Sequence, residues 1–437
     1  MVVKITKPVQ GGTIRAIASK SEAHRLLICS ALSENETFLS CPERSEDIDA
    51  TVRCLTAIGA SIEYRTDKTN ETATNGFYIK PVDLHGNEVQ NNKYIILDCG
   101  ESGATLRFLL PVYGALGLPV SFTMAGRLPS RPLTGLYEEM TNHGNLISKP
   151  GTSPLTCEGQ LTSGTYTIPG DISSQFISGL LLALPLLHGD STIRVTGILE
   201  SRPYVDITLG ALRLFGIKIN EENENIFNIP GGQLYRSPGT IEVGGDWSNA
   251  AFWLSAGAIG QGGITCTGLD LKSGQGDKQI TGFLERFGAY ITCGNNSVTV
   301  SPGKLSGIEI DAGDTPDLVP VLAAVASVAE GKTVIRNAGR LRIKESDRLH
   351  TVTKTLLAFG ADIKETDDGL IITGRKSLTG GEIESFGDHR IAMTAAVISK
   401  VCTGDVLIRD AGAVRKSYPG FFDDFSNILG GAWEEIV

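Results

Sequence analysis

The sequence predicts an α/β fold built from six repeated units, and three observations carry this prediction. The first is a glycine that recurs at regular spacing after an amphipathic helix pattern. The second is a set of helix patterns that are apolar on most sides. The third is β-rich sequence between these helices. The recurring glycines are Gly59, Gly144, Gly216, Gly288, Gly360 and Gly431, which are separated by 85, 72, 72, 72 and 71 residues.

Each recurring glycine follows an amphipathic helix pattern and precedes a strand pattern. One example is ALRLFGIKI, which ends at Ile219, and a degenerate sixth copy is FSNILGGAW, which ends at Trp433. A helix often ends in a left-handed residue, a conformation that glycine adopts without steric cost. These copies therefore predict one amphipathic helix in each unit.

The second helix class opens with a polar or glycine-containing turn and continues into apolar and small residues such as LVPVLAAVASVA. A helix that is apolar on most sides is covered all round, so we expect these helices to be inner ones. If their N-termini gather at one end of each domain, backbone N–H groups form a receptor for anions there. The openings are residues 19–25, 100–103, 170–175, 245–249, 313–317 and 387–390.

The chain of 437 residues is too long for one comfortable core, so six units divide naturally into two domains of three. The most turn-rich linker contains Pro230-Gly231-Gly232 and Ser237-Pro238-Gly239. It predicts a domain boundary near residue 240.

Composition restricts the class of protein. The net charge of −10 argues against nucleic acid or an anionic membrane as the main partner. The N-terminal sequence lacks a signal-peptide core, and no window approaches about 18 unbroken apolar residues, so we expect a cytoplasmic protein. The eight cysteines are dispersed without a C-x-x-C pair, and the six histidines lack zinc-site spacing. We therefore expect reduced cysteines, no metal site and no cofactor.

Cations stand near inner-helix starts, where the helix dipole disfavours them by ~0.3 to 1 kcal/mol each unless an anion is present. Lys20 and Arg25 lie in SKSEAHR, and Arg107 lies in ESGATLR. The segment RLRIKESDRL, residues 340–349, is more basic still. If a helix begins near Lys344, then Lys344 and Arg348 form a like-charge pair that costs ~0.2 to 0.5 kcal/mol without a partner.

Further basic residues occur in Gly/Pro-rich loops or near helix starts: Arg127, Arg131, Arg202, Arg390 and Lys416. Any one of them alone indicates a surface ion pair, but together they indicate substrates that carry phosphates and a carboxylate. Interspersed Asp317, Glu345 and Asp388 are candidates for proton transfer, because a carboxylate among cations stays ionised and can act as a base.

These motifs carry a resemblance to a known family. SKSEAHR, GESGATLR, the R-x-x-x-R-P of residues 127–132, SSQF, RLRIKESDRL, GDHR and RKSYPG follow one another in the order typical of the 5-enolpyruvylshikimate-3-phosphate synthase family. The match covers essentially the whole chain, and KESDR together with GDHR is its specific part. The resemblance implies an inside-out α/β barrel of two domains, each with three βαβαββ repeats around a pseudo-threefold axis. It also adds a second crossover near residue 18, so the expected domains are residues 1–18 with 241–437, and residues 19–240.

The resemblance implies transfer of the enolpyruvyl group of phosphoenolpyruvate to the 5-hydroxyl of shikimate 3-phosphate. The reaction releases phosphate, passes through a tetrahedral intermediate in a cleft between two closing domains, and needs no metal. The implied phosphoenolpyruvate ligands are Lys20, Gly103, Arg127, Gln175, Arg348, Arg390 and Lys416. The implied shikimate 3-phosphate ligands are Ser21, Arg25, Ser173, Ser174, Gln175, Ser201, Tyr204, Asp317, Arg340 and Lys344. We expect a monomer with these two small anionic substrates as its partners.

The catalytic residues implied by the resemblance are Lys20, Asp317, Glu345 and His389. Asp317 is the preferred base for the 5-hydroxyl proton, Glu345 the preferred acid for the methylene carbon, and His389 orients the site. An exchange of roles among Lys20, Asp317 and Glu345 stays open.

The sequence departs from the family pattern GNAGTAMRP at Glu101, Ala104 and Phe108, which puts sensitivity to the inhibitor glyphosate in doubt. Arg340 stands where many members have Asn. Two alternatives to the implied reaction are kept. One is UDP-N-acetylglucosamine enolpyruvyl transfer, although the loop GRLPSRP lacks the catalytic Cys of that enzyme. The other is a non-catalytic phosphometabolite-binding protein, which has no need of Asp317 and Glu345 together.

Overall fold

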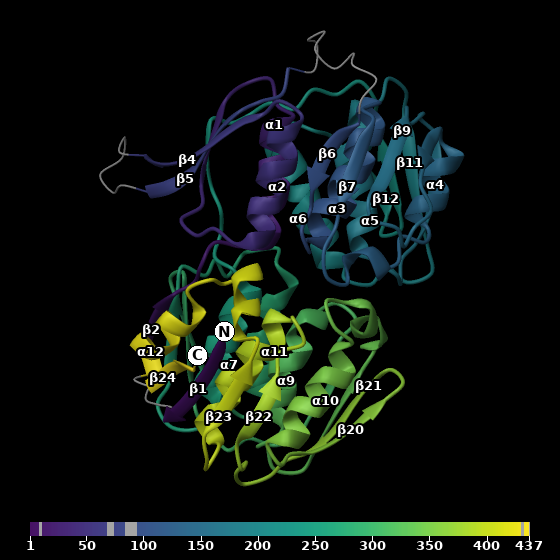
Figure 1. The fold of residues 1–437 in the computed structure, drawn as a ribbon. Coiled ribbons are helices and arrows are strands. Elements are labelled where there is room, and N and C mark those ends of the chain that lie inside the picture. Colours follow the sequence, from purple (N-terminus) through teal and green to yellow (C-terminus); the bar gives the residue numbers. More distant parts are fainter. Residues whose placement is uncertain (8–10, 68–73, 84–93, 430–431, 437) are drawn as a thin grey trace. The chain divides into compact units, whose positions relative to one another are not determined.

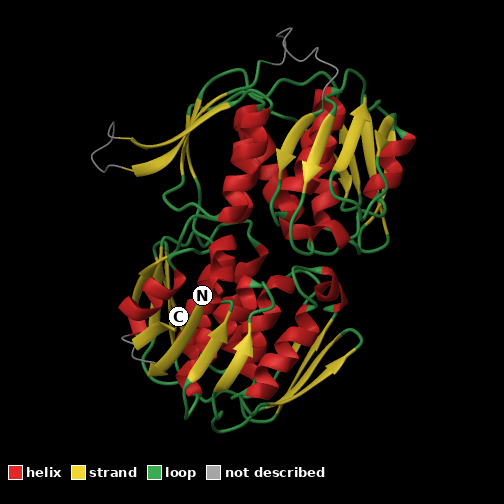
Figure 2. Ribbon diagram, viewed as in Figure 1, coloured by secondary structure: helices red, strands yellow, loops and turns green. Residues whose placement is uncertain are grey.

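The computed structural model describes residues 1–7, 11–67, 74–83, 94–429 and 432–436 of the chain. Helices and short strands alternate along it (Figures 1 and 2). The chain divides into two compact units. Unit 1 comprises Met1–Ser19 with Gly244–Val437, and unit 2 comprises Lys20–Val243. The predicted α/β fold class is confirmed.

The predicted inner helices are present and buried. In α9 and α11 every residue is buried, because apolar and small side chains cover all sides of these helices. The starts of four of them are capped by a Ser or Asp side chain, which accepts a hydrogen bond from a backbone N–H of the first turn. The inner helices are α1 (Lys20–Ala31), α3 (Gly103–Leu116), α5 (Ser174–Ala183), α7 (Trp247–Ala258), α9 (Val319–Ala326) and α11 (His389–Ile398).

The helices that precede the recurring glycines are amphipathic, as predicted. In α8 the buried residues are Ile280, Phe283, Leu284 and Phe287, which form one apolar stripe. The glycines that follow α2, α4, α6, α8 and α10 have left-handed φ values between 78° and 110°, whereas Gly431 lies outside the described residues. The helices are α2 (Glu46–Ala57), α4 (Leu136–Asn142), α6 (Arg202–Leu214), α8 (Ile280–Phe287), α10 (Arg348–Ala358) and α12 (Phe421–Leu429).

Short 3₁₀ helices occupy several connections and helix ends. They are η2 (Leu128–Ser130), η3 (Leu184–Leu186), η4 (Gly276–Gln279), η5 (Pro316–Leu318), η6 (Gly339–Ile343), η7 (Ser399–Val401) and η8 (Ala411–Lys416). Within the described ranges, no helix is both long enough and apolar enough to cross a membrane.

The described strands form six four-stranded sheets with one shared plan. In each sheet an edge strand pairs in parallel with its neighbour, and the other two pairings are antiparallel. Because the same plan recurs six times, the structure repeats as the glycine spacing predicts.

The sheets of unit 2, in spatial order, are β14 (Thr240–Glu242), β3 (Thr37–Ser40), β5 (Thr74–Lys80) and β4 (Ser61–Asp67); β6 (Ile95–Asp98), β7 (Val120–Thr123), β9 (Leu155–Gly159) and β8 (Asn145–Ile147); and β10 (Thr165–Pro169), β11 (Ser191–Thr196), β13 (Ile226–Ile229) and β12 (Asn220–Asn223). The sheets of unit 1 are β2 (Gly12–Arg15), β15 (Ile264–Thr267), β17 (Ser297–Ser301) and β16 (Tyr290–Gly294); β18 (Glu309–Asp311), β19 (Lys332–Arg336), β21 (Gly369–Thr373) and β20 (Asp362–Thr366); and β22 (Gly381–Glu384), β23 (Val406–Arg409), β1 (Val2–Lys7) and β24 (Ala432–Ile436).

Two strands belong to a different repeat from the helix that follows them in sequence. Strand β2 precedes α1 but pairs with β15 in unit 1, whereas β14 precedes α7 but pairs with β3 in unit 2. At the N-terminus, Val3 of β1 pairs with Ile408 of β23 and with Glu435 of β24. The N-terminal strand and the C-terminal strand therefore complete one sheet of unit 1.

The core of unit 1 holds the starts of its inner helices in place. Trp253 of α7 stacks on Phe421 of α12 with ring centroids 5.0 Å apart, and Val298 and Val300 of β17 are fully buried. Burial of each such aliphatic side chain contributes roughly 1.5–3 kcal/mol. This packing positions the charged side chains at the helix starts.

Candidate active site

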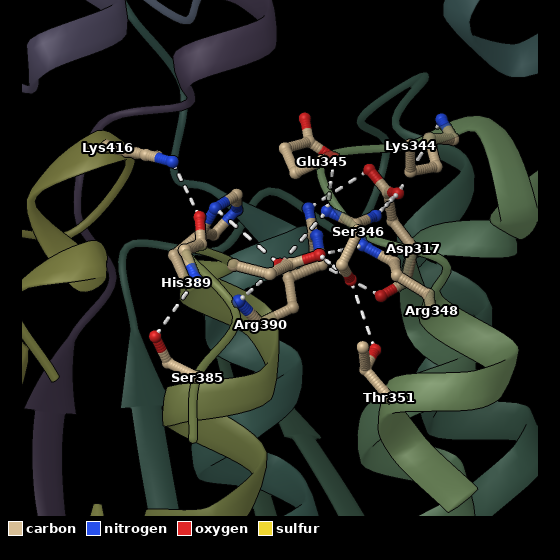
Figure 3. A network of polar contacts seen from close by, with 12 residues as sticks. Asp317, Lys344, Glu345, Ser346, Arg348, Thr351, Ser385, His389, Arg390 and Lys416 are labelled. Atoms are coloured by element: carbon tan, nitrogen blue, oxygen red, sulfur yellow. Dashed lines mark hydrogen bonds and ion pairs between the residues drawn. The ribbon is translucent and has the colours of Figure 1, made fainter. Parts of the chain in front are cut away.

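Unit 1 contains a network of carboxylates and cations at the starts of α9, α10 and α11 (Figure 3). Asp317 lies in η5, directly before α9. Its Oδ1 accepts a hydrogen bond from Arg348 Nη1 at 2.8 Å, and its Oδ2 accepts one from Arg390 Nη2 at 3.0 Å. The predicted base candidate is therefore held by two guanidinium groups from two different helices.

Arg348 is the centre of this network. Its Nε donates to Asp388 at 2.8 Å, and its Nη2 donates to Glu345 Oε2 at 2.7 Å. With the bond from Nη1 to Asp317, the guanidinium binds three different carboxylates, and Nη2 also donates to Asp388 Oδ1 at 3.4 Å. Its side chain is only 2% exposed, and the three carboxylates compensate the cost of burying its charge.

The protonation of Asp317 and Lys344 follows from this crowding. Burial raises the pKa of Asp317, but Arg390, Lys344 and Arg348 outweigh burial and hold this pKa well below its ordinary value. Asp317 is therefore ionised at neutral pH. Burial lowers the pKa of Lys344 to about 8, although Asp317, 3.9 Å from its Nζ, favours the charged form.

No helix begins near Lys344, so the condition for a like-charge pair of Lys344 and Arg348 is not met. Helix α10 begins at Arg348, and the side chain of Asp347 caps it by accepting a hydrogen bond from His350 N at 3.2 Å. Lys344 lies before this cap in extended conformation, because η6 ends at Ile343. The like-charge pair on one helix face therefore does not form, and Lys344 faces Asp317 instead.

The remaining residues predicted in unit 1 surround this network. His389 is the first residue of α11, and its Nδ1 lies 4.0 Å from Asp388 Oδ1. Lys416 donates to the carbonyl oxygen of Gly387 at 2.5 Å, and Arg340 donates to that of Gly313 at 2.7 Å.

The start of α7 joins the starts of α9 and α11 through Arg390, which donates to Ser248 Oγ at 2.7 Å and to Asp317. The predicted gathering of inner-helix starts is thus confirmed for unit 1. The positive ends of the helix dipoles and the cations at one end of these helices favour the binding of anions.

Unit 2 has its own cluster of cations. Lys20 is the first residue of α1, and its Nζ donates a hydrogen bond to Oδ2 of Asp47 in α2 at 2.7 Å. Sequence reasoning explained Lys20 by an anionic ligand and missed this protein carboxylate. The available signal was the acidic first turn of α2, where Asp47 follows the Ser45 cap.

Arg25 differs from Arg348 because its hydrogen-bond acceptors are all uncharged. Its guanidinium donates to Thr208 Oγ1 at 2.6 Å, to Ser21 O at 2.6 Å and to Tyr204 O at 2.9 Å, and it lies 4.7 Å from the ring centroid of Phe108. Burial lowers its pKa to about 10, so it remains protonated at neutral pH. Burial of a guanidinium against neutral acceptors favours an anionic ligand.

The other residues predicted in unit 2 lie at helix starts or in loops. Ser173 caps α5 through Gln175 N, and Ser174 is the first residue of that helix. Ser201, with φ of 56°, precedes α6, and exposed Arg127 precedes η2. Gly103 begins α3, where an added Cβ would lie 2.6 Å from Nη1 of Arg131, so a larger residue there would displace the Arg131 guanidinium.

Two polar residues of the network have roles that the sequence did not indicate. Asp388 was a candidate for proton transfer, but it is fully buried and accepts hydrogen bonds from Arg348 and Ser346. Ser346 was missed, although KESDR contains it. In the part of the chain that the structure describes, no group of three or more His, Cys, Asp or Glu side chains could hold a metal ion.

Comparison with known proteins shows that the chain is similar to one family. The family model of EPSP synthase (3-phosphoshikimate 1-carboxyvinyltransferase) matches residues 3–425. The 3-phosphoshikimate 1-carboxyvinyltransferase of Clostridium kluyveri is 44% identical over 425 residues, which are 97% of this chain and 96% of the relative. The protein of the same name from Clostridium perfringens strain SM101 is 44% identical and covers 99% of both chains.

Solved structures show the same fold. An EPSP synthase from Acinetobacter baumannii superposes with a TM-score of 0.80 at 26% identity and covers 99% of this chain and 100% of its own. The enolpyruvyl transferase NikO from Streptomyces tendae has a TM-score of 0.78 at 18% identity, with coverage of 99% and 98%, so it supports the fold alone.

Proposed function

The chain belongs to the EPSP synthase family, and from this premise we propose that it transfers the enolpyruvyl group of phosphoenolpyruvate to the 5-hydroxyl of shikimate 3-phosphate. The reaction releases phosphate and serves the shikimate pathway of aromatic amino-acid biosynthesis. The observation that carries the proposal is the network in unit 1. There, Lys344, Arg348 and Arg390 surround the carboxylates of Asp317 and Glu345, as a reaction between two anions with proton transfer requires.

The substrate assignments rest on the family motifs and on the cations described above. In unit 1, Arg348, Arg390 and Lys416 are proposed to bind phosphoenolpyruvate, and Arg340 and Lys344 to bind shikimate 3-phosphate. In unit 2, Lys20, Gly103, Arg127 and Gln175 are proposed for phosphoenolpyruvate. Those proposed there for shikimate 3-phosphate are Ser21, Arg25, Ser173, Ser174, Gln175, Ser201 and Tyr204.

The proposed chemistry is addition followed by elimination. The 5-hydroxyl oxygen bonds to C2 of phosphoenolpyruvate, a base takes the hydroxyl proton, and an acid donates a proton to the C3 methylene carbon. A tetrahedral ketal phosphate results. The new methyl group then loses a proton, and the bond between C2 and the phosphate oxygen breaks. These two changes release phosphate and restore the double bond.

Asp317 is the proposed base and Glu345 the proposed acid, with Lys20 as a further proposed catalytic residue and His389 as an orienting residue. In the structure the cations hold Asp317 in its weakly basic, ionised form, and Glu345 is paired with Arg348. Anionic substrates compete for these cations. We therefore expect substrate binding to weaken the hold of Arg348 and Lys344 on both carboxylates, so that proton transfer becomes easier.

We also infer two domains, residues 1–18 with 241–437 and residues 19–240, and the division into two compact units supports this inference. Closure of the domains on the substrates stays a prediction. A monomer in the cytoplasm is proposed as well, and analytical ultracentrifugation of the purified protein tests the oligomeric state.

A coupled phosphate-release assay tests the function. Phosphate should appear only when both phosphoenolpyruvate and shikimate 3-phosphate are present. Binding of shikimate 3-phosphate without turnover would favour the binding-protein alternative, and turnover with UDP-N-acetylglucosamine would favour the other enolpyruvyl transferase.

A further inference from the structure

Arg107 links two inner helices of unit 2 where the proposed substrate ligands lie. It stands in the second turn of α3, and its side chain reaches the first turn of α5. Its Nη1 donates to Gln175 Oε1 at 2.9 Å, and its Nη2 donates to the carbonyl oxygen of Pro132 at 3.2 Å. The residue is only 3% exposed, so these bonds are shielded from water.

The contact determines how the Gln175 amide is oriented. A guanidinium group only donates hydrogen bonds, so the amide atom that faces it must be the oxygen. Nε2 of Gln175 then points away from Arg107. Within the described residues Nε2 makes no hydrogen bond, so both of its N–H groups remain available to an oxygen-rich ligand.

The second bond of Arg107 holds the loop that carries Arg127. Pro132 ends the motif R-x-x-x-R-P, and the guanidinium of Arg131 packs near Arg107 over Gly103. A Cβ at Gly103 would lie 2.6 Å from Arg131 Nη1 and 3.1 Å from Arg107 Nη1. The glycine therefore leaves room for both guanidinium groups at the start of α3.

We propose that Arg107 is a positioning residue for the substrate site, which orients the Gln175 amide so that Nε2 donates to the anionic substrate. This inference rests on the proposed function for the identity of the substrate, but the contact itself does not. Arg107 acts through Gln175 and the Pro132 carbonyl, so we expect it to influence binding and turnover without touching the substrate.

A double-mutant cycle tests the proposal. Arg107→Met should lower kcat/KM for phosphoenolpyruvate by about tenfold to a hundredfold, the range for loss of a hydrogen bond to a charged group. In the Gln175→Met background the same change should cost much less, because the amide to be oriented is gone. Arg107→Lys, which keeps one donor, should restore part of the loss. Exposed Arg194, in β11, provides the matched control Arg194→Met, for which no change is expected.

Equal losses in both backgrounds would show a merely structural role and overturn the proposal. A second measurement does not depend on activity. In protein labelled with ¹⁵N-glutamine, the side-chain amide signals of Gln175, identified by their loss in Gln175→Met, should shift in ligand-free Arg107→Met. Unshifted signals would also overturn the proposal. An inactive wild type that still shows this shift would instead contradict the proposed function alone.

Discussion

The guanidinium of Arg348 and the carboxylate of Asp388 form a buried ion pair, with 2.8 Å between Nε and Oδ2 and side-chain exposures of 2% and 0%. Asp388 also caps α11, since its Oδ1 accepts a hydrogen bond from Arg390 N at 3.0 Å, and it accepts a further one from Ser346 Oγ at 3.0 Å. One carboxylate therefore joins the starts of α10 and α11, so two of the three arginines proposed to bind phosphoenolpyruvate, Arg348 and Arg390, depend on the same residue.

Removal of this carboxylate should destabilise the protein strongly. Asp388→Ala should lower the free energy of unfolding by about 3–5 kcal/mol, because Arg348 is left buried with one fewer counter-ion. Urea denaturation followed by circular dichroism measures the change. The control is Asp405→Ala, which removes the partner of Lys4 in an exposed ion pair and should leave the midpoint nearly unchanged. Equal midpoints for the two variants would contradict the prediction.

Glu345→Gln should depress turnover far more than ligand affinity. The amide keeps the size of the side chain and can still accept a hydrogen bond from Arg348, but it cannot donate a proton to carbon. We expect kcat to fall by about 10²- to 10⁴-fold, with Kd values for both substrates changed only a few-fold. Steady-state kinetics and calorimetry measure the two effects, with Glu330→Gln in an exposed ion pair as the control. An unchanged kcat would remove the proposed role of Glu345.

The pKa of Lys344, lowered to about 8 chiefly by burial, predicts a pH dependence of substrate binding. Below that pH the ammonium group is charged and can attract the anionic shikimate 3-phosphate. Above it the charge is lost, so kcat/KM for shikimate 3-phosphate should fall as pH rises past about 8. The variant Lys344→Arg stays charged, so its profile should lack this step. If both profiles fall alike, the titrating group is not Lys344.

Lys400 predicts a pH dependence of stability. Its Nζ donates to the carbonyl oxygen of Ala256 at 2.6 Å, and burial lowers its pKa from 10.5 to about 8. Between these two values the unfolded chain binds more protons than the folded protein, so this residue makes stability rise as pH increases from about 8 to about 10.5.

The variant Lys400→Met should lose that rise, whereas Lys304→Met, at an exposed position, should keep it. Urea midpoints measured at intervals across this pH range provide the comparison. A rise that persists unchanged in Lys400→Met would mean that another group causes it.

Much of the fold follows from local patterns in the sequence. The repeat was visible because each amphipathic helix carries its own periodicity and is followed by a left-handed glycine, as at Gly216 and Gly360. The motif residues of the site were also visible, through their resemblance to a family. The start of α10 at Arg348 was not located from the sequence, because only the backbone geometry shows that Asp347 caps this helix.

The sequence by itself determined the six α/β units, the two classes of helix and the residues able to bind anions. Only the tertiary structure decided how those residues pair: that Lys20 meets Asp47, that Arg25 meets only neutral acceptors, and that Arg348 binds three carboxylates. The reason is physical. Periodicity and capping depend on residues within a turn or two, whereas charge compensation depends on which distant segments the packed helices bring together.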